Sequence, residues 1–159
     1  MKKISIALLI YLQISLLAGD LLFASVVIDD RSYKATITRD VWGVPHVFGK
    51  TDADAAFGMA FAHAQDDIKN LTDNISLYRA EMGLKQGLKG VVSDYLIKAL
   101  KIREMVAEGY EAKLSSQVRE VIEGYVAGLN YWIDLHPNRD YQALFPVTKY
   151  DIVSGFVIQ

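Results

Sequence analysis

The chain contains no cysteine, and only three of its 159 residues are proline. The lack of cysteine excludes thiolate nucleophiles, thiolate metal sites and disulfides. An excess of basic residues is also missing: the formal net charge is −2, so composition gives no basis for nucleic-acid binding. The residues that are present, 52% hydrophobic and 23% charged, are typical of one globular domain with its own core.

Long hydrophobic runs are absent too, apart from one at the N-terminus. Two lysines precede an uncharged apolar run from Ile4 to Gly19, which is the pattern of an export signal. Small residues mark two cleavage points, after Gly19 and after Ala24. We therefore predict a signal peptide over residues 1–24, a mature region over residues 25–159, and a periplasmic or secreted location.

The same run permits a rival hypothesis, an uncleaved membrane anchor over residues 1–27. A membrane-spanning helix needs about 20 apolar residues, and this run is shorter. The flanking lysines and small residues favour cleavage instead. An anchor would make the chain a membrane-anchored helical binding module without catalysis. A third hypothesis is a decayed enzyme fragment without function.

The first mature segment has the pattern of a strand. Apolar and polar residues alternate from Tyr33 to Val41, and several are β-branched. Tyr33, Ala35 and Ile37 would share one face. Gly43 and Pro45 then end the pairing, and Val47–Gly49 predicts a second short strand.

Helical signals fill the rest of the chain. Thr51, with an acid three residues later, predicts a capped helix that runs to about Met82 and stops at Gly83. A glycine-containing loop would lead to a second helix from Ser93 to about Lys113. Apolar residues spaced by three and four predict a third helix from Ser115 or Ser116 up to Pro137. For the second helix we predict these buried positions: Tyr95, Leu96, Ala99, Leu100, Ile102 and Met105.

Candidate catalytic groups are few. His63 would share a helical face with Asp66 and Asp67, and such a carboxylate–imidazole pair could bind metal, but a metal site needs three or four ligands and no HExxH pair occurs. No G-x-S-x-G elbow occurs either. We therefore predict that His63, Gln65 and Asp66 are buried polar groups that bind backbone amides and fix the helix to the sheet. His46, at a strand end, is predicted to be a structural hydrogen-bonding group.

Several stretches together resemble the α-chain of the penicillin acylase family of N-terminal-nucleophile hydrolases. Later parts of the resemblance are Arg79–Gly83, Gly124–Ile133 and Pro146–Val153. Asp67-Ile68-Lys69 departs from the family pattern toward acyl-homoserine-lactone acylases. The first and longest stretch, ATITRDVWGVPHVFGKTDADAAFGMAFAHAQDD, supplies the following family residues in order: Arg39, Asp40, Gly43, Pro45, His46, Phe57, Gly58, Ala60, Phe61, Ala64, Gln65 and Asp66.

The resemblance implies an α/β (α+β) fold, mostly helical, with one or two N-terminal strands that join the sheet of a β-chain from the same precursor. It implies hydrolysis of a linear N-acyl amide by a serine at the start of that β-chain, beyond Gln159. No residue of this chain is then catalytic, and calcium is possible only in the full enzyme. The resemblance makes a scaffold motif of these residues: Arg39, Asp40, Gly43, Pro45, His46, Gln65 and Asp66.

Overall fold

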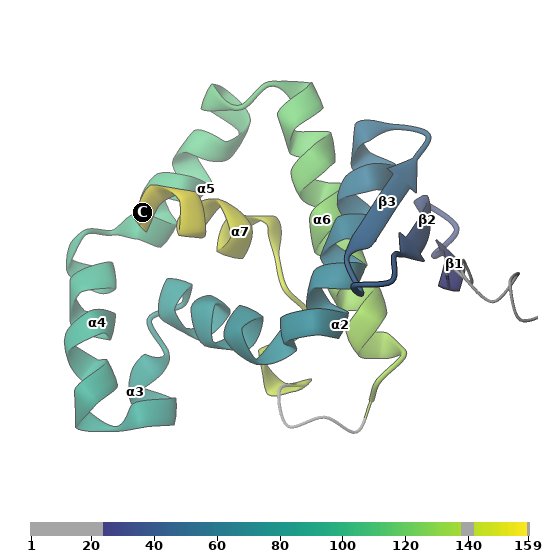
Figure 1. Cartoon of the computed structure of the whole chain (residues 1–159). Helices are drawn as coiled ribbons and strands as arrows, with labels where there is room; N and C mark the ends of the chain where they lie inside the picture. Colours follow the sequence, from purple (N-terminus) through teal and green to yellow (C-terminus); the bar gives the residue numbers. More distant parts are fainter. Residues whose placement is uncertain (1–23, 138–141, 159) are drawn as a thin grey trace, which may run out of the picture.

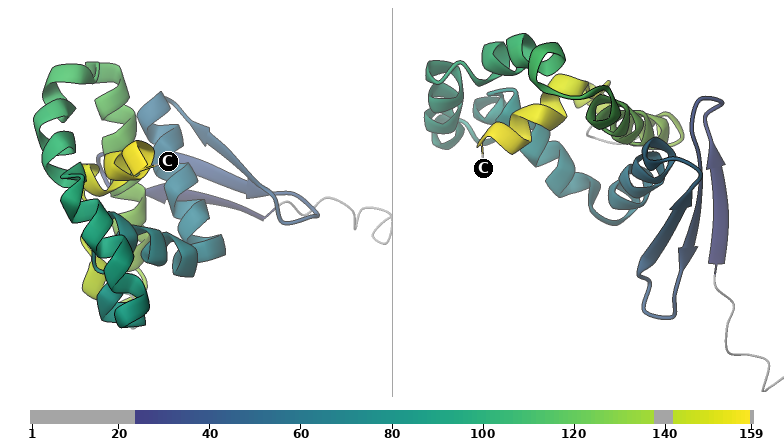
Figure 2. Two further views of the ribbon diagram at one scale, coloured as in Figure 1. Left: turned by 90° about the vertical axis from the view of Figure 1, so that its left-hand side faces the viewer. Right: turned by 90° about the horizontal axis from the view of Figure 1, so that it is seen from above.

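The structure, a computed structural model, describes residues 24–137 and 142–158. The predicted signal peptide therefore lies outside the described residues except for its last residue, Ala24. A small sheet stands at one end of the molecule and helices α3 and α4 at the other (Figures 1 and 2). None of the helices in the described ranges is long and apolar enough to cross a membrane.

The sheet has three antiparallel strands in the order β1-β2-β3. The predicted strand is confirmed as β2 (Lys34–Arg39) and the second short strand as β3 (Pro45–Gly49). The structure adds a further strand, β1 (Ala24–Asp29), to the one or two that were expected. The last residues of the alternative anchor, 24–27, are thus part of a strand rather than of a helix.

Helix α2 (Asp52–Tyr78) covers one face of the sheet. Thr51 caps it as predicted: its hydroxyl accepts from the Asp54 amide, and the Asp54 carboxylate accepts from the Thr51 amide. The helix ends at Tyr78 and not at Met82, because Ala80 takes the left-handed backbone conformation (φ 56°) that the sequence assigned to Gly83.

The middle of the chain differs from the prediction. The expected loop is helical, with α3 (Met82–Gln86) running almost directly into α4 (Leu88–Ala99). The expected second helix is divided, because Lys101 has left-handed backbone angles (φ 51°) and α5 (Ile102–Lys113) begins after it. This break changes which side chains face inward, so most of the predicted buried positions were wrong: Tyr95, Leu96, Ala99, Leu100 and Met105 are exposed, and Ile102 is buried.

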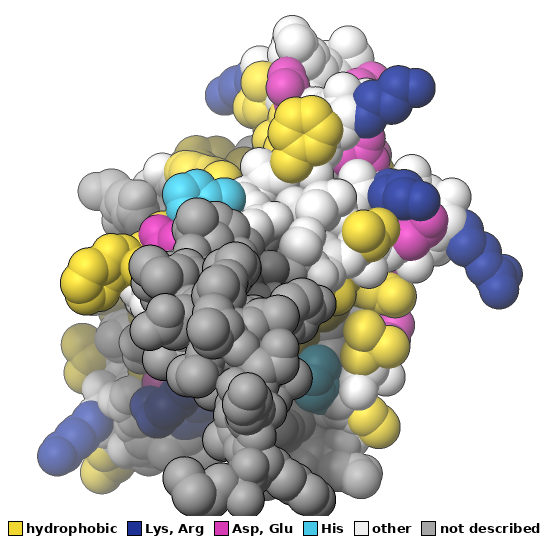
Figure 3. Space-filling model, turned by 45° about the vertical axis from the view of Figure 1, so that its right-hand side comes forward, with side chains coloured by type: hydrophobic (Ala, Val, Ile, Leu, Met, Phe, Trp, Pro, Cys, Tyr) yellow, Lys and Arg dark blue, Asp and Glu magenta, His cyan; other side chains and the backbone are white. Residues whose placement is uncertain are grey.

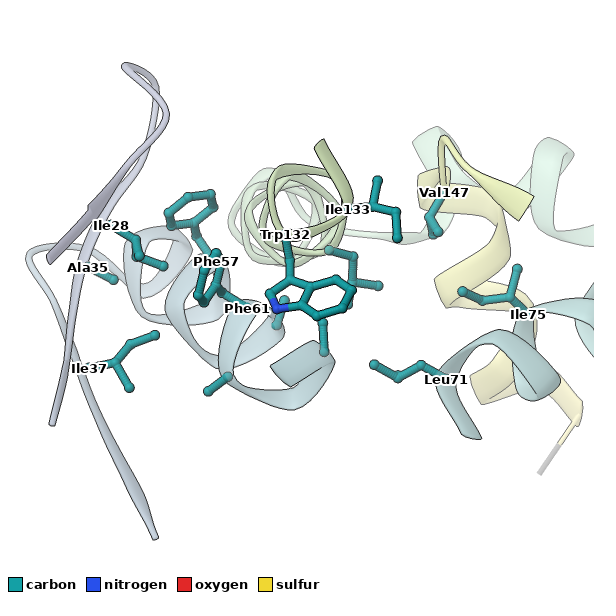
Figure 4. Close-up of a cluster of buried hydrophobic side chains, with 14 residues drawn as sticks. Ile28, Ala35, Ile37, Phe57, Phe61, Leu71, Ile75, Trp132, Ile133 and Val147 are labelled. Carbon is teal, nitrogen blue, oxygen red and sulfur yellow. The ribbon is translucent and has the colours of Figure 1, made fainter. Parts of the chain in front are cut away.

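The C-terminal half returns to the core. Helix α6 (Ser116–Asp134) is confirmed and is capped by the Ser115 hydroxyl, which accepts from the Val118 amide. A short 3-10 turn, η1 (Gln142–Leu144), leads to α7 (Lys149–Ile158), which packs between α5 and α2. In the main core, Ile28 and Ile37 of the sheet meet Phe57, Phe61 and Trp132 of α2 and α6 (Figure 4).

Candidate functional site

The turn between β2 and β3 is built around one carboxylate. Asp40 Oδ1 accepts from the backbone amides of Trp42 and Val44, each at 2.9 Å. Gly43 completes the turn with a positive φ of 81°, which glycine adopts at little cost, and its amide donates to the Asp40 carbonyl. The local sequence therefore fixes this hairpin with few other contacts.

The second oxygen of Asp40 faces His46. His46 Nε2 lies 3.4 Å from Asp40 Oδ2, a long contact between two partly or fully solvent-exposed side chains. Desolvation acts against ionisation of Asp40, but hydrogen bonds from the amides of Val44 and Trp42 and from His46 together hold its pKa below the usual range. The carboxylate is therefore an acceptor at neutral pH, which suits a structural turn.

Arg39 joins this turn to helix α2. Its guanidinium donates to the Gly43 carbonyl at 2.7 Å, and to the two carboxylate oxygens of Asp66 at 2.7 and 3.2 Å. It also donates to Gln65 Oε1 at 3.2 Å. A bidentate arginine–carboxylate pair has a fixed geometry, so this contact sets the angle between the hairpin and the helix. Pro45 pairs with Arg39 across the sheet and begins the edge strand.

The polar residues of α2 are therefore placed differently from the prediction. His63, Gln65 and Asp66 are exposed rather than buried, and their partners are side chains rather than backbone amides. The reason is that α2 ends its contact with the sheet here, so the polar side chains lie at the margin of the interface. His63 Nδ1 lies 2.8 Å from the hydroxyl of Tyr125 on α6.

Asp67 interrupts α2. Its backbone (φ −150°, ψ 50°) is not helical, and its side chain accepts from both the amide and the side chain of Asn70. Asp67 thus caps the second half of a kinked helix, a role that an aspartate three residues before a polar partner could have suggested. Because the helix is interrupted at Asp67, the shared helical face predicted for His63, Asp66 and Asp67 does not form. Within the described ranges no cluster of histidine, aspartate and glutamate could hold a metal ion.

The family-like stretches in the second half meet at a buried carboxylate. Asp151, on α7, is completely buried and accepts two hydrogen bonds from Arg79, at 3.0 and 2.7 Å. Arg103 of α5 donates a third at 2.7 Å, and Thr148 donates from its amide and its hydroxyl. Arg79 also binds the carbonyls of Leu144 and Pro146. One carboxylate therefore connects the end of α2, helix α5 and the start of α7.

Two effects act on the pKa of Asp151 in opposite directions. Burial alone would raise the pKa of Asp151, but the hydrogen bonds from Arg79, Arg103 and Thr148 prevail and hold it far below its usual range. The hydrogen bond to Asp151 in turn raises the pKa of Arg79. The sequence marked Arg79 and Asp151 only as family-like residues; no local signal joins two residues 72 positions apart.

Further contacts hold the loop before α7. The side-chain amide of Asn130 donates to the carbonyl of Val147 at 2.9 Å and accepts from its amide at 2.8 Å. Asn130 thus pairs with both the backbone amide and the carbonyl of Val147, a residue whose side chain is buried.

The hydrogen bonds described above join helices, strands and loops to one another. The histidines have as partners Asp40, Tyr125 and, for His136, the carbonyl of Trp132. In the part of the chain that the structure describes, no histidine is hydrogen-bonded to a serine or threonine hydroxyl, the contact that a base–nucleophile pair requires.

Comparisons with known proteins agree on one family. A family model described as penicillin amidase matches residues 34–154. Penicillin acylase 2 proenzyme of Pseudomonas sp. (strain SE83) is 32% identical over 114 residues, which are 70% of this chain and 14% of that protein. Acyl-homoserine lactone acylase PvdQ of Pseudomonas savastanoi pv. phaseolicola is 29% identical over 119 residues, 70% of this chain and 15% of the relative.

A solved structure shows the same fold. Thermostable penicillin G acylase from Alcaligenes faecalis superimposes with a TM-score of 0.60 at 22% identity, over 84% of this chain and 71% of the matched chain. The chain spans only about a seventh of the length of the two curated relatives described above.

Proposed function

The chain belongs to the penicillin amidase family, and on this premise we propose that it is the N-terminal α-chain part of an acylase that hydrolyses a linear N-acyl amide to a carboxylic acid and an amine. The names of the relatives suggest a penicillin or an acyl-homoserine lactone as substrate. The observation that carries the proposal is the family match, which extends over residues 34–154.

The geometry of the matched region supports a scaffold role. Arg39 holds the hairpin against α2, and Asp151 holds α2, α5 and α7 together. Both contacts use the family-like residues, and neither leaves a nucleophile–base pair for chemistry. We therefore assign Arg39, Asp40, Gly43, Pro45, His46, Gln65 and Asp66 to positioning.

The proposed chemistry needs no group from this chain. In the N-terminal-nucleophile mechanism a serine becomes the first residue of the β-chain, and its own α-amine, acting through a water, takes the proton of its hydroxyl. Hydrogen-bond donors then stabilise the negative oxygen of the tetrahedral intermediate. Calcium, if the full enzyme holds it, would need further ligands from outside the described residues, because these contain no group of three or more histidine or acidic side chains that could hold a metal ion. No step is assigned to it.

Exposed apolar side chains support the proposal that a partner polypeptide binds this chain. Trp42, at the tip of the β2–β3 hairpin, is 87% exposed, and Phe48 of β3 is 76% exposed. Leu84 and Leu88, at the opposite end, are each 88% exposed. Apolar side chains also stand on the surface of the sheet end (Figure 3). Exposed large apolar side chains are found at protein interfaces, and we propose that the β-chain covers the hairpin tip.

The test is to measure amide hydrolysis with the 159-residue chain alone and after mixing or co-expression with a partner polypeptide that supplies the rest of the proposed α-chain and the β-chain. Both a penicillin and an N-acyl-homoserine lactone serve as substrates. We expect no turnover from the chain alone and clear turnover from the pair. A matched pair in which the first serine of the β-chain is changed to alanine should be inactive while still assembling.

Hydrolysis by the isolated chain would overturn the scaffold assignment. Assembly without hydrolysis of any N-acyl amide would contradict the acylase activity and leave only the binding role. Export, which the N-terminal run suggests, is tested separately by the cellular fraction in which the chain is found and by its first residue there.

A further inference from the structure

A pocket of about 390 Å³ lies between the two halves of α2 and helices α6 and α7. The kink at Asp67 creates it, because the second half of α2 turns away from the first and leaves a concave wall. His63 lines the pocket from before the kink, and Leu71 and Ile75 line it from after the kink. The volume lies within the range of small-molecule sites, roughly 300–1,000 Å³.

Apolar side chains make up most of the lining. Leu71, Ile75, Ile122 and Leu129 form most of its inner wall, and no aspartate, glutamate, lysine or arginine lines it. Burial raises the pKa of Tyr125 to about 12, so its phenol stays neutral. A carboxylate or ammonium group would face no carboxylate, ammonium or guanidinium group of the lining and would lose its hydration. The lining therefore favours an uncharged ligand.

One side of the pocket carries a hydrogen-bonded polar pair. His63 Nδ1 and the Tyr125 hydroxyl are 2.8 Å apart, and both residues line the pocket. If the hydroxyl donates to His63, its oxygen still accepts a further hydrogen bond; if it accepts, its proton remains to be donated. Asn74 adds an exposed amide on the neighbouring wall.

We propose that this pocket binds an uncharged amphiphile, with an apolar body against the leucine and isoleucine wall and a neutral hydrogen-bonding head, such as a phenol, alcohol or amide, on Tyr125. The proposal goes beyond the acylase function, since binding requires neither the β-chain nor hydrolysis. Its outcome can therefore be read on the chain whether or not the acylase proposal holds.

The test uses N-phenyl-1-naphthylamine, a neutral fluorescent amphiphile, titrated into the complete 159-residue chain at pH 7.5. We expect saturable binding. Asn74→Trp places a large side chain at the pocket and should weaken binding at least tenfold. Tyr125→Phe keeps the shape and should weaken binding about fivefold, the usual contribution of one hydrogen bond. Circular dichroism of each variant checks that the fold is kept.

Two controls decide where the probe binds and why. Leu84→Trp changes an exposed residue of α3 that lines a hollow sharing no residue with this pocket, and it should alter binding less than twofold. The neutral 4-hexylphenol should displace the probe at a concentration at least tenfold lower than the anionic 4-hexylbenzoate. Absence of saturable binding, equal loss in N74W and L84W, or equal displacement by the two competitors would each overturn the proposal.

Discussion

At the strand end of the molecule, α6 lies directly against α2, whereas toward the opposite end the end of α2 packs with α4, α5 and α7 through a much smaller cluster. The first region buries fourteen residues in one core that includes Phe57, Leu129 and Trp132. The smaller cluster contains four buried residues: Ala80, Ile97, Ile102 and Val106. In that second region, large apolar side chains such as Leu88 and Tyr95 remain exposed.

The difference shows that helices of one chain can either bury their apolar faces against each other or leave them exposed. Between α2 and α6 the apolar faces are covered by the chain itself, so packing limits which residues fit there, although the hairpin leaves Trp42 and Phe48 exposed. The helical end presents apolar side chains to the surroundings, where substitutions meet few neighbours. The cluster of Arg79, Arg103 and Asp151 lies at the boundary and connects the two regions.

Removing the charge at that boundary should have the largest effect. Asp151→Asn leaves the largely buried Arg79, 17% exposed, without its counter-charge. We expect a loss of about 3–5 kcal/mol in the free energy of unfolding, measured by urea denaturation at pH 7. Glu111→Gln is the matched control, because Glu111 is an exposed carboxylate that pairs with Lys149 and Arg119, and its loss should cost less than about 1 kcal/mol. Equal losses would contradict the buried-charge explanation.

The same carboxylate predicts a pH dependence. Because the pKa of Asp151 is lowered in the folded chain, it stabilises the fold above the unfolded pKa of about 4. That stabilisation is lost as the pH falls from there toward the folded value. The gap between wild type and Asp151→Asn should therefore narrow between pH 7 and pH 3 in the same denaturation assay. A gap that is independent of pH would mean that shape, rather than charge, explains the first result.

A single methyl group should distinguish the two regions. A Cβ at Gly128 would lie 2.2 Å from the carbonyl oxygen of Phe57 and 2.9 Å from Ala60, so α6 and α2 must separate. We expect Gly128→Ala to cost about 1–3 kcal/mol in thermal or chemical unfolding. Gly109→Ala, in α5, meets only Lys113 at 3.5 Å and should be neutral or stabilising by about 0.5–1 kcal/mol. Similar costs at both sites would remove the contrast in packing.

The two regions also differ in how well the sequence predicts them. At the strand end, the alternation of β2, the Thr51 cap and the spacing of α6 are local signals, and the structure follows them. At the helical end, the left-handed Lys101 and the start of α4 at Leu88 have no such signal. The prediction from periodicity alone placed one continuous helix across the break at Lys101 and therefore assigned the wrong face as buried.

The candidate site was predictable in its residues but not in its contacts. The motif named Arg39 and Asp66, yet their hydrogen bond joins positions 27 apart, and a single sequence contains no information about such a pair. The kink at Asp67 is an intermediate case. Its cap on Asn70 follows a known local preference, but a continuous apolar pattern through α2 concealed it.

Arg39→Gln tests whether the hairpin depends on α2 for its position. The pair with Asp66 is partly exposed, at 26% and 47%, so we expect a loss of only about 1 kcal/mol in the free energy of unfolding. The larger change should be local, with faster hydrogen exchange at the Trp42 and Val44 amides. Arg39→Lys keeps the charge but not the bidentate geometry and should exchange almost as fast. Exchange unchanged in both variants would show that Asp40 alone fixes the turn.

The smallest effect on stability should come from the exposed face of the helical end. Leu88→Ser changes a side chain that is 88% exposed, and we expect the free energy of unfolding to move by less than about 0.5 kcal/mol. Solubility should rise, because an exposed apolar side chain is removed. Ile97→Ala, on the same helix but 7% exposed, should cost about 2–5 kcal/mol. If Leu88→Ser destabilises the isolated chain as much as Ile97→Ala, the face is packed in solution, and the contrast between the two ends does not hold there.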